Sequence, residues 1–247
     1  MQLSAVIITF NEERNIERCL LSLQGIADEI IVVDSLSTDK TEAICRKFDV
    51  KFYKQEWLGY SAQKNYANSL ASFPMILSID ADEALSEHLR QSIRAIKAED
   101  NSKAYSFNRL TNYCGRWIKH CGWYPDTKVR IFNKEIYWQG EQVHETLSIP
   151  PNMTIKHLKG DLLHFSYYSI SEHLRQIDRF TDIAAAESKN NRRKPCFIGI
   201  IARSKWKFVR DYFFKLGFLD GKMGYQVCKL SSWATYIKYA KIYEQDS

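Results

Sequence analysis

The sequence is poor in features that mark several common classes of nucleotide-binding protein. Glycine accounts for 10 of its 247 residues, below the usual share of about 7%. The turn after the first strand-like run, TFNEERN, contains none. A dinucleotide-binding turn needs glycines so that the backbone can approach a pyrophosphate, and a P-loop needs Gly-Lys-Ser or Gly-Lys-Thr, which this sequence lacks. Both kinds of phosphate-binding turn are therefore excluded.

Long apolar runs and paired cysteines are also missing. The best apolar stretch, CFIGIIA at 196–202, is far shorter than the roughly 20 residues that cross a bilayer. Met1 leads straight into a strand-like pattern, without the basic start of a secretory leader. The six cysteines form no CxxC pair and no zinc-like spacing, so we expect mostly buried free thiols in a reducing compartment. These absences predict a cytoplasmic protein.

Positive charge is concentrated at the C-terminal end. The net charge is +6, yet 189–247 contains 13 Lys/Arg and 4 Asp/Glu, which leaves the remaining residues at −3. The stretch IIARSKWKFVRDYFFKLGF mixes large apolar and basic residues at helical spacing, as in helices that lie peripherally in an anionic membrane interface. A helix packed on the main domain, with a solvated basic face, fits the pattern equally well. Nucleic acid is the other anionic partner that a basic region of this kind could bind. The sequence contains no groove-reading or base-stacking element, so we expect no nucleic-acid partner.

The first 99 residues alternate between strand and helix patterns. Apolar, β-branched runs predict buried strands at 3–10, 28–34, 50–55 and 75–80. Amphipathic patterns with capping residues predict helices at 11–25, 37–48, 61–72 and 86–99. This order predicts an α/β domain with a mostly parallel sheet flanked by helices. Ligands of such sheets bind outside the carboxyl ends of the strands.

After residue 100 the pattern changes to aromatic-rich strands, and from about Ser169 it reads as helices. We therefore predict an α/β domain over 1–168 and a helical, basic and aromatic region over 169–247, for which contact with a membrane surface and packing on the main domain both stay open. The glycines of GFLDGKMG mark the break between the last two helices.

The stretch LSIDADEAL places carboxylates at the end of the fourth strand. If strand geometry continues, Asp80 and Asp82 share a face, and like charges that close need a cation. Carboxylates suit Mg²⁺ or Mn²⁺, which take substrate phosphates as further ligands. Asp34, after the second strand, is placed to accept hydrogen bonds from a base or ribose. The pattern thus indicates a nucleotide-diphosphate donor whose diphosphate departs; the alternative is that Asp80 is a cap and Asp82 with Glu83 starts a solvated helix.

Three ordered motifs, VIITFNEERNIERCLLSL, EIIVVDSLSTDKT and QKNYA with ILSIDADE, resemble family 2 glycosyltransferases with the GT-A fold. Later motifs, WYPDTKVRIF, GEQVHETL and GFLDGKMG, resemble a narrower branch, the bacterial lipopolysaccharide inner-core β-1,4-glucosyltransferases. The resemblance extends over nearly the whole chain. It implies a nucleotide-sugar-binding half at 1–99 and an acceptor half at 100–168 of the GT-A domain.

The resemblance also implies roles for individual residues. The donor-binding residues that it implies are Thr9, Phe10, Glu12, Asp34, Lys64 and Asp80. Asp80 and Asp82 would form the metal and ribose motif (DXD), with Asp82 as the direct ligand of Mg²⁺ or Mn²⁺. The family usually has glycine where Leu36 stands, which leaves the turn around Ser35 open.

Such enzymes invert the anomeric carbon in one displacement, and a carboxylate takes the acceptor hydroxyl's proton. The matching stretch is GEQVHETL, where we predict Glu145 as the base, with Glu141 and Asp126 in reserve. His144 could orient the base and His164 could complete the metal shell, although a hydrogen-bonded structural histidine fits both positions equally.

The implied reaction moves a hexose, glucose in our working assignment, from a UDP-sugar to an inner-core heptose of a lipid-linked saccharide. An acceptor of another kind, such as a polyprenyl phosphate, a capsule repeat or a protein, would leave the donor half unchanged. With a lipid-linked acceptor, we expect the protein to act at the inner face of the cytoplasmic membrane.

Overall fold

The computed structural model describes residues 2–96, 102–140, 145–188 and 196–244. The chain divides into two compact units. Unit 1 comprises Met1–Arg109 and Asp126–His164, and unit 2 comprises Leu110–Pro125 and Phe165–Ser247. Each has a hydrophobic core of its own. The predicted domain boundary after residue 168 stays a prediction.

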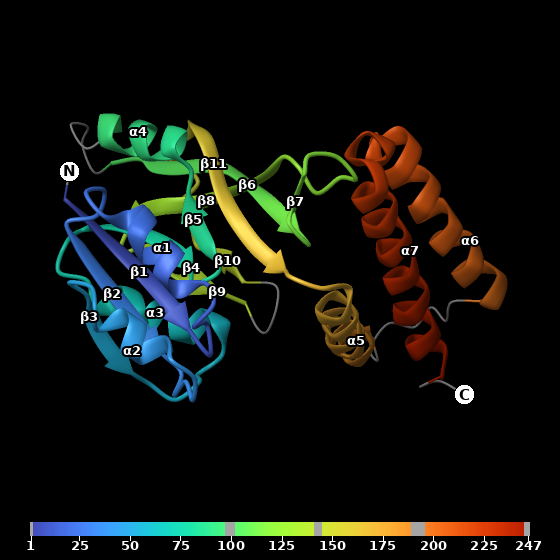
Figure 1. Ribbon diagram of the computed structural model, residues 1–247, viewed down its shortest axis with the longest axis horizontal. Helices are drawn as coiled ribbons and strands as arrows, with labels where there is room; N and C mark the ends of the chain where they lie inside the picture. Colours follow the sequence, from blue (N-terminus) through green and yellow to red (C-terminus); the bar gives the residue numbers. More distant parts are fainter. Residues whose placement is uncertain (1, 97–101, 141–144, 189–195, 245–247) are drawn as a thin grey trace. The chain divides into compact units, whose positions relative to one another are not determined.

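Unit 1 is built on a mixed sheet (Figure 1) with the strand order β3-β2-β1-β4-β8-β6-β11-β5. The first four strands pair in parallel, whereas β4 with β8, β8 with β6 and β11 with β5 pair antiparallel. The strand bounds are β1 Leu3–Thr9, β2 Glu29–Asp34, β3 Lys51–Lys54, β4 Met75–Asp80, β5 Glu83–Leu85, β6 Ala104–Tyr113, β8 Asp126–Asn133 and β11 Ile155–Tyr167. A separate pair joins β9 Trp138–Gln139 to β10 Thr146–Leu147. The four predicted strands of the first half are confirmed.

The two faces of this sheet carry two cores, because successive side chains of a strand point to opposite sides. On β1, Ala5 and Ile7 join the core that contains Leu20 of α1, while Val6 joins the core that contains Ala67 of α3. The helices of unit 1 are α1 Ile16–Leu23, α2 Thr41–Cys45, α3 Tyr60–Ser69 and α4 Glu87–Ile96. Helices therefore flank both faces, as the alternating pattern predicts.

The first helix begins later than its sequence pattern indicates. The pattern predicts a helix from residue 11, but α1 starts at Ile16 and Asn11 has φ +53°. Its Oδ1 accepts a hydrogen bond from the N–H of Thr38 (2.8 Å), and its own N–H donates to Ser37 Oγ (2.8 Å). These hydrogen bonds connect the TFNEERN turn to the turn after β2, so both turns lie at the same edge of the sheet.

In that second turn, leucine adopts a backbone conformation that favours glycine. Leu36 has φ +63° and its side chain is 47% exposed. A side chain with a Cβ pays about 1 kcal/mol or more in the left-handed region, and glycine does not. The turn left open by the sequence is thus formed, at a cost in backbone strain.

We expect Leu36→Gly to unfold with a free energy about 1 kcal/mol higher than Leu36→Ala. Both variants remove the same exposed side chain, so their difference reports the backbone alone. At Ala43, an exposed position of α2, glycine should instead be worse than alanine by about 1 kcal/mol. Urea unfolding of the three variants and the native protein checks this; an alanine at position 36 that is as stable as glycine would contradict it.

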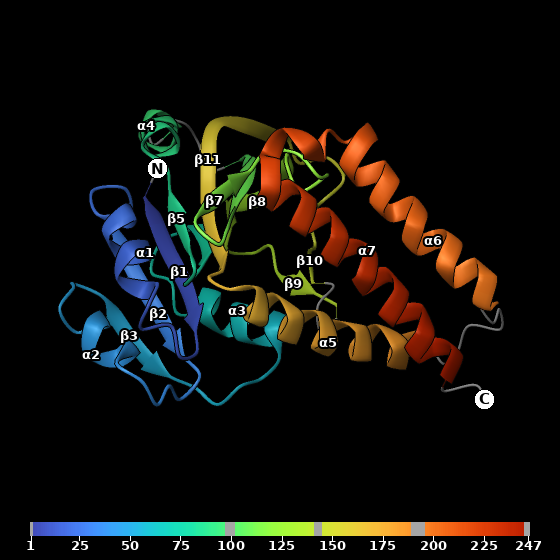
Figure 2. The ribbon, with the colours of Figure 1, turned by 45° about the vertical axis from the view of Figure 1, so that its right-hand side comes forward.

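Unit 2 contains the helices expected after Ser169 (Figure 2), and α7 packs against both α5 and α6. Its elements are β7 Arg116–Ile118, α5 Ile170–Glu187, α6 Phe197–Val209, the π-helix η2 Arg210–Phe214, the 3₁₀ helix η3 Gly217–Asp220 and α7 Gly221–Glu244. At Gly224, in the first turn of α7, a Cβ would lie 2.0 Å from the carbonyl oxygen of Gly217 in η3. Only glycine therefore fits this close approach between the two helices. Among the described residues, no helix has both the length and the hydropathy to cross a bilayer.

Candidate active site

The carboxyl ends of the parallel strands gather the polar residues that the sequence predicts for one edge. In the sheet register Thr9 of β1 pairs with Asp34 of β2, and Ile8 pairs with Asp80 of β4. Thr9, Asp34 and Asp80 therefore lie at the same edge, where α/β proteins bind ligands. This placement of three predicted residues follows from parallel pairing alone.

A buried arginine stands at the centre of the site. Arg130 of β8 is 4% exposed, and its Nη2 lies 3.0 Å from Asp80 Oδ2 and 2.9 Å from Glu83 Oε1. The N–H of Asp80 donates to the other oxygen of Glu83 (2.9 Å). One guanidinium thus joins the last residue of β4 to the first residue of β5 and fixes the turn between them.

Charge pairing sets the protonation of this cluster. Burial opposes ionisation of Asp80, but Lys64 and Arg130 outweigh it and hold the pKa of its carboxyl well below the ordinary value. For Glu83, burial prevails over the attraction of Arg130, and its pKa is raised. The pKa of Arg130 is raised because Glu83 and Asp80 outweigh the effect of its burial. The cluster therefore keeps Asp80 as an anion and Arg130 as a cation.

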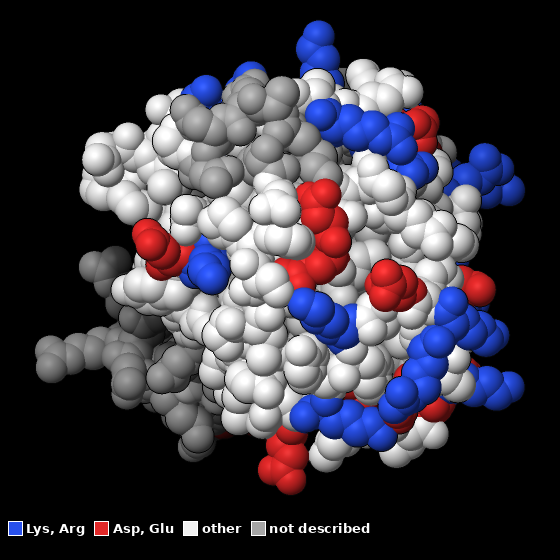
Figure 3. All heavy atoms as spheres, turned by 90° about the vertical axis from the view of Figure 1, so that its left-hand side faces the viewer, with Lys and Arg blue, Asp and Glu red and all other residues white. Residues whose placement is uncertain are grey.

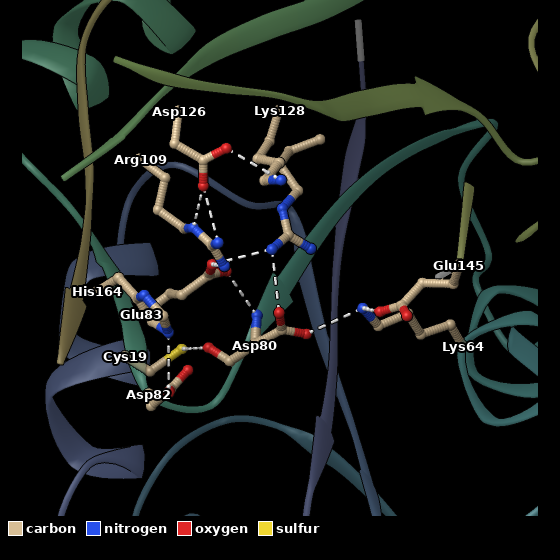
Figure 4. A network of polar contacts seen from close by, with 11 residues as sticks. Cys19, Lys64, Asp80, Asp82, Glu83, Arg109, Asp126, Lys128, Glu145 and His164 are labelled. Carbon is tan, nitrogen blue, oxygen red and sulfur yellow. Dashed lines mark hydrogen bonds and ion pairs between the residues drawn. The ribbon is translucent and has the colours of Figure 1, made fainter. Parts of the chain in front are cut away.

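The predicted base and the predicted nucleotide-facing lysine lie side by side. Lys64 of α3 is buried, and its Nζ lies 3.1 Å from Glu145 Oε1 and 3.3 Å from Asp80 Oδ1. The same ammonium lies over the ring of Trp138, 4.7 Å from the ring centroid. Residues from three separate stretches of sequence, Lys64, Asp80 and Glu145, thus meet at one point, as Figure 4 shows.

Asp82 faces another partner. The expectation that strand geometry continues through Asp82 is wrong, because β4 ends at Asp80 and a turn follows. Asp80 turns to Lys64 and Arg130, whereas Asp82 Oδ2 lies 3.2 Å from His164 Nε2 of β11. The Asp82 and His164 side chains both remain partly exposed. A carboxylate oxygen and an imidazole nitrogen at this spacing are a suitable start for a Mn²⁺ or Mg²⁺ shell.

The chemistry of the donors favours Asp82 over Asp80 as a metal ligand. Both oxygens of Asp80 already lie against the cations Lys64 and Arg130. Within the part of the chain that the structure describes, no three His, Cys, Asp or Glu side chains are grouped as a complete metal site. Asp82 and His164 are the residues that would hold a divalent metal here; Mg²⁺ and Mn²⁺ usually take further ligands from substrate phosphates and water.

The reserve bases fare differently. Asp126 is bound by Arg109 through two contacts, at 2.9 Å and 2.8 Å, and by Lys128 at 3.0 Å. Both of its oxygens are thus engaged in ion pairs. Glu141 and His144 lie outside the described residues.

The predicted nucleotide-binding residues Thr9 and Asp34 differ in their hydrogen bonding. Thr9 Oγ1 is buried and has no hydrogen-bond partner among the described residues. Phe10 is exposed. Asp34 is fully buried and accepts hydrogen bonds from the backbone N–H (2.8 Å) and the hydroxyl of Ser37. Its predicted contact with a base stays a prediction and would require Ser37 to share or yield an oxygen.

Glu12 lies in the same electrostatic field as the aspartates. Its Oε2 accepts a hydrogen bond from Asn15 Nδ2 (2.8 Å). Burial, reinforced by the charges of Asp82 and Asp80, raises the pKa of Glu12 to about 7 despite that hydrogen bond. The carboxyl is therefore half protonated near neutral pH.

This shift makes native stability fall as the pH rises. The folded protein retains the Glu12 proton up to about pH 7, whereas the unfolded chain loses it near pH 4.5. The contribution of the protonated carboxyl to the free energy of unfolding is therefore complete below pH 4.5 and is lost above pH 7. We expect Glu12→Gln to be more stable than the native protein by about 2 kcal/mol at roughly pH 8, and equally stable at roughly pH 4. Urea unfolding at both values tests this, with the exposed Glu17→Gln of α1 as control; a gain at low pH as large as at high pH would contradict it.

Arg130, Arg109 and Glu83 were not identified as site residues from the sequence. A signal was present, because arginine is rarely fully buried unless paired, and KVRIF places Arg130 inside a strand-like run. Arg109 lies 3.6 Å from Glu83 and binds Asp126, so it links the outer carboxylate to the buried one.

Sequence comparison agrees with this geometry. The sequence profile of Glycosyl transferase family 2 matches residues 4–169. The chain belongs to this family. A relative from Rickettsia bellii (strain RML369-C), an uncharacterized glycosyltransferase, is 31% identical and aligns with 98% of this chain and 86% of its own length. The lipopolysaccharide core biosynthesis glycosyltransferase LpsC of Rhizobium meliloti (strain 1021) is 28% identical, over 99% of this chain and 93% of its own length.

Among solved structures, S. aureus TarS 1-349 in complex with UDP has a TM-score of 0.50 and 15% identity, and covers 100% of this chain and 91% of its own. At that identity the likeness shows the fold alone. It agrees with the GT-A architecture, in which a mixed sheet with a parallel half is flanked by helices and a helical C-terminal region follows.

Proposed function

We propose that this glycosyltransferase moves a hexose, glucose in our working assignment, from a UDP-sugar to a heptose of the lipopolysaccharide inner core, with inversion at the anomeric carbon. The observation that carries the proposal is the convergence of Lys64, Asp80 and Glu145 beside the Asp82–His164 pair. Family membership and the likeness to LpsC support a role in lipopolysaccharide core assembly. The reaction would take place at the cytoplasmic face of the membrane.

On the donor side, the exposed Phe10 would meet the uridine, together with Thr9, whose hydroxyl has no hydrogen-bond partner in the described part of the chain. Asp82 and His164 would hold a divalent metal, which when bound neutralises charge on a departing diphosphate. Asp80 would face the ribose, held in place by Lys64 and Arg130. Because both cations are buried, this anchor is rigid before any ligand arrives.

On the acceptor side, Glu145 is the proposed base. Its carboxylate takes the proton of the acceptor hydroxyl while the hydroxyl oxygen bonds to C1 of the sugar and the bond from C1 to the UDP oxygen breaks. Lys64, 3.1 Å away, positions Glu145. The electron pair of the broken bond leaves with UDP, so the step needs no further reactant.

The direct test is product analysis. The purified full chain is incubated with core lipid from a strain that lacks the enzyme and with UDP-glucose, UDP-galactose or UDP-N-acetylglucosamine. The mass of the lipid product is then measured by mass spectrometry. We expect one hexose to be added, with UDP-glucose as the preferred donor, and no addition by Asp82→Asn. Transfer only to a polyprenyl phosphate, a capsule repeat or a protein would overturn the acceptor assignment.

A further inference from the structure

One side of α6 is apolar and turned to solvent. Its inner side packs, since Ile200 is 1% exposed and Phe208 joins the core of unit 2. Along the other side, three to four residues apart, stand Ile198 (79% exposed), Ala202, Trp206 (56%) and Val209, and Phe213 of η2 (55%) continues this spacing. A helix that packs on its own domain normally keeps its apolar stripe inside and its polar residues outside. Helix α6 has apolar residues on both sides.

The apolar side continues beyond α6. Phe214 of η2 is 70% exposed, and its ring lies 5.8 Å from that of Trp206. Phe218 and Leu219 of η3 are exposed as well. We call these residues the outer surface of unit 2: Ile198, Trp206, Val209, Phe213, Phe214, Phe218 and Leu219. These seven large exposed apolar residues lie within 22 positions of sequence. Such a group exceeds the scattered exposure usual for soluble proteins and marks an interaction site.

Within residues 197–222, the exposed charges are of one sign. Exposed basic residues follow the outer surface through the sequence: Arg203, Lys205, Lys215 and Lys222. The two acidic residues between 197 and 222 are withdrawn from solvent. Asp211 is 1% exposed and paired with Lys207 at 2.6 Å, and Asp220 accepts hydrogen bonds from the backbone (2.8 Å) and ring (2.9 Å) of His120.

Unit 1 presents a contrasting surface. The face around α2 and β3 shows acidic and basic side chains interspersed (Figure 3). Several of them pair directly, such as Lys51 with Glu29 and Lys54 with Glu42. Such a face is suited to water, whereas aromatic residues beside unopposed lysines suit the boundary between lipid headgroups and acyl chains.

We propose that the outer surface of unit 2 docks on an anionic phospholipid bilayer, with its apolar side chains in the headgroup region and the lysines on lipid phosphates. Charge complementarity selects this partner, because a second copy of the same surface would bring lysines against lysines. The inference goes beyond the sugar-transfer reaction and does not depend on which donor is used. It gives the protein a way to reach a lipid-linked acceptor.

The experiment is co-sedimentation of the full chain with vesicles of phosphatidylcholine alone and of phosphatidylcholine with phosphatidylglycerol. We expect binding to the anionic vesicles only. Trp206→Ser with Phe214→Ser should weaken it about tenfold or more, through loss of the inserted rings. Lys205→Glu with Lys215→Glu should weaken it by a similar factor or more, since each basic residue at an anionic surface contributes a factor of about five.

Matched controls come from unit 1. Tyr137 has the same exposure as Phe213, at 55%, so Tyr137→Ser should leave vesicle binding unchanged, as should Lys47→Glu at an exposed position after α2. Calorimetric UDP binding by each variant keeps this test separate from the reaction proposed above. Absence of vesicle binding by the native protein, equal binding by the outer-surface variants, or tighter binding to duplex DNA than to vesicles would overturn the proposal.

Discussion

Replacing Arg130 with methionine is expected to lower the free energy of unfolding by about 3–5 kcal/mol. Methionine fills much of the same space, so the loss comes from charge. Glu83 (1% exposed) would remain beside the Asp80 carboxylate without its closest cation, and removing one partner of a buried ion pair leaves the other uncompensated. Urea or thermal unfolding measures the change.

Two further variants define the cause. Arg46→Met removes an exposed i,i+4 pair with Glu42 and should change stability by no more than about 0.5 kcal/mol. Adding Glu83→Gln to Arg130→Met should recover part of the loss, with a coupling energy of about 1–3 kcal/mol. If Arg130→Met were as stable as Arg46→Met, the central ion cluster would not be holding the turn between β4 and β5.

Replacing Glu145 with glutamine is expected to lower kcat for sugar transfer by about 10²–10⁴, the usual contribution of a positioned base. The UDP-sugar dissociation constant should stay within about threefold, because the donor contacts proposed above do not include Glu145. Transfer kinetics and calorimetry on the same preparation measure both quantities.

The choice among carboxylates is tested in parallel. Asp126→Asn loosens the ion pairs with Arg109 and Lys128 and should affect stability more than kcat. Glu135→Gln, an exposed residue after β8, should change neither. A full loss of kcat in Asp126→Asn with retained activity in Glu145→Gln would move the base to Asp126.

Local patterns in the sequence were sufficient for the parallel half of the fold. Apolar runs marked β1, β2 and β4 within one or two residues, and parallel pairing then placed Thr9, Asp34 and Asp80 at one edge. Lys64 and Glu145 could be included because the family resemblance names them, although they stand 81 positions apart.

The centre of the site could not be predicted, because it depends on the antiparallel register between distant strands. Arg130 reaches Asp80 since β8 lies beside β4, with Leu77 opposite Ile131. No local pattern encodes that register. The turn after Asp80 was missed for a related reason. The alternation of apolar and acidic residues in IDADEA (79–84) suits a strand, but the hydrogen bonds that Glu83 accepts from Arg130 and from the N–H of Asp80 favour a turn.

The helical region shows the same limit. Its composition predicted an amphipathic basic helix, yet α6 is apolar on two sides, and sequence alone does not say which one packs. The structure assigns Ile200 and Phe208 to the inside and Trp206 and Phe213 to the outside. The distinction decides which substitutions disturb folding and which disturb a surface.

The measurement that tests the central claim most directly is calorimetric titration of UDP into the native protein and Asp82→Asn, with Mn²⁺, with Mg²⁺ and with a chelator. If Asp82 and His164 hold a metal that receives the diphosphate, the native protein binds UDP in the presence of metal, and either chelator or Asp82→Asn weakens binding by about tenfold or more. UDP binding that is equal in all conditions, or absent from all of them, would contradict the account of this site as a metal-assisted nucleotide-sugar centre.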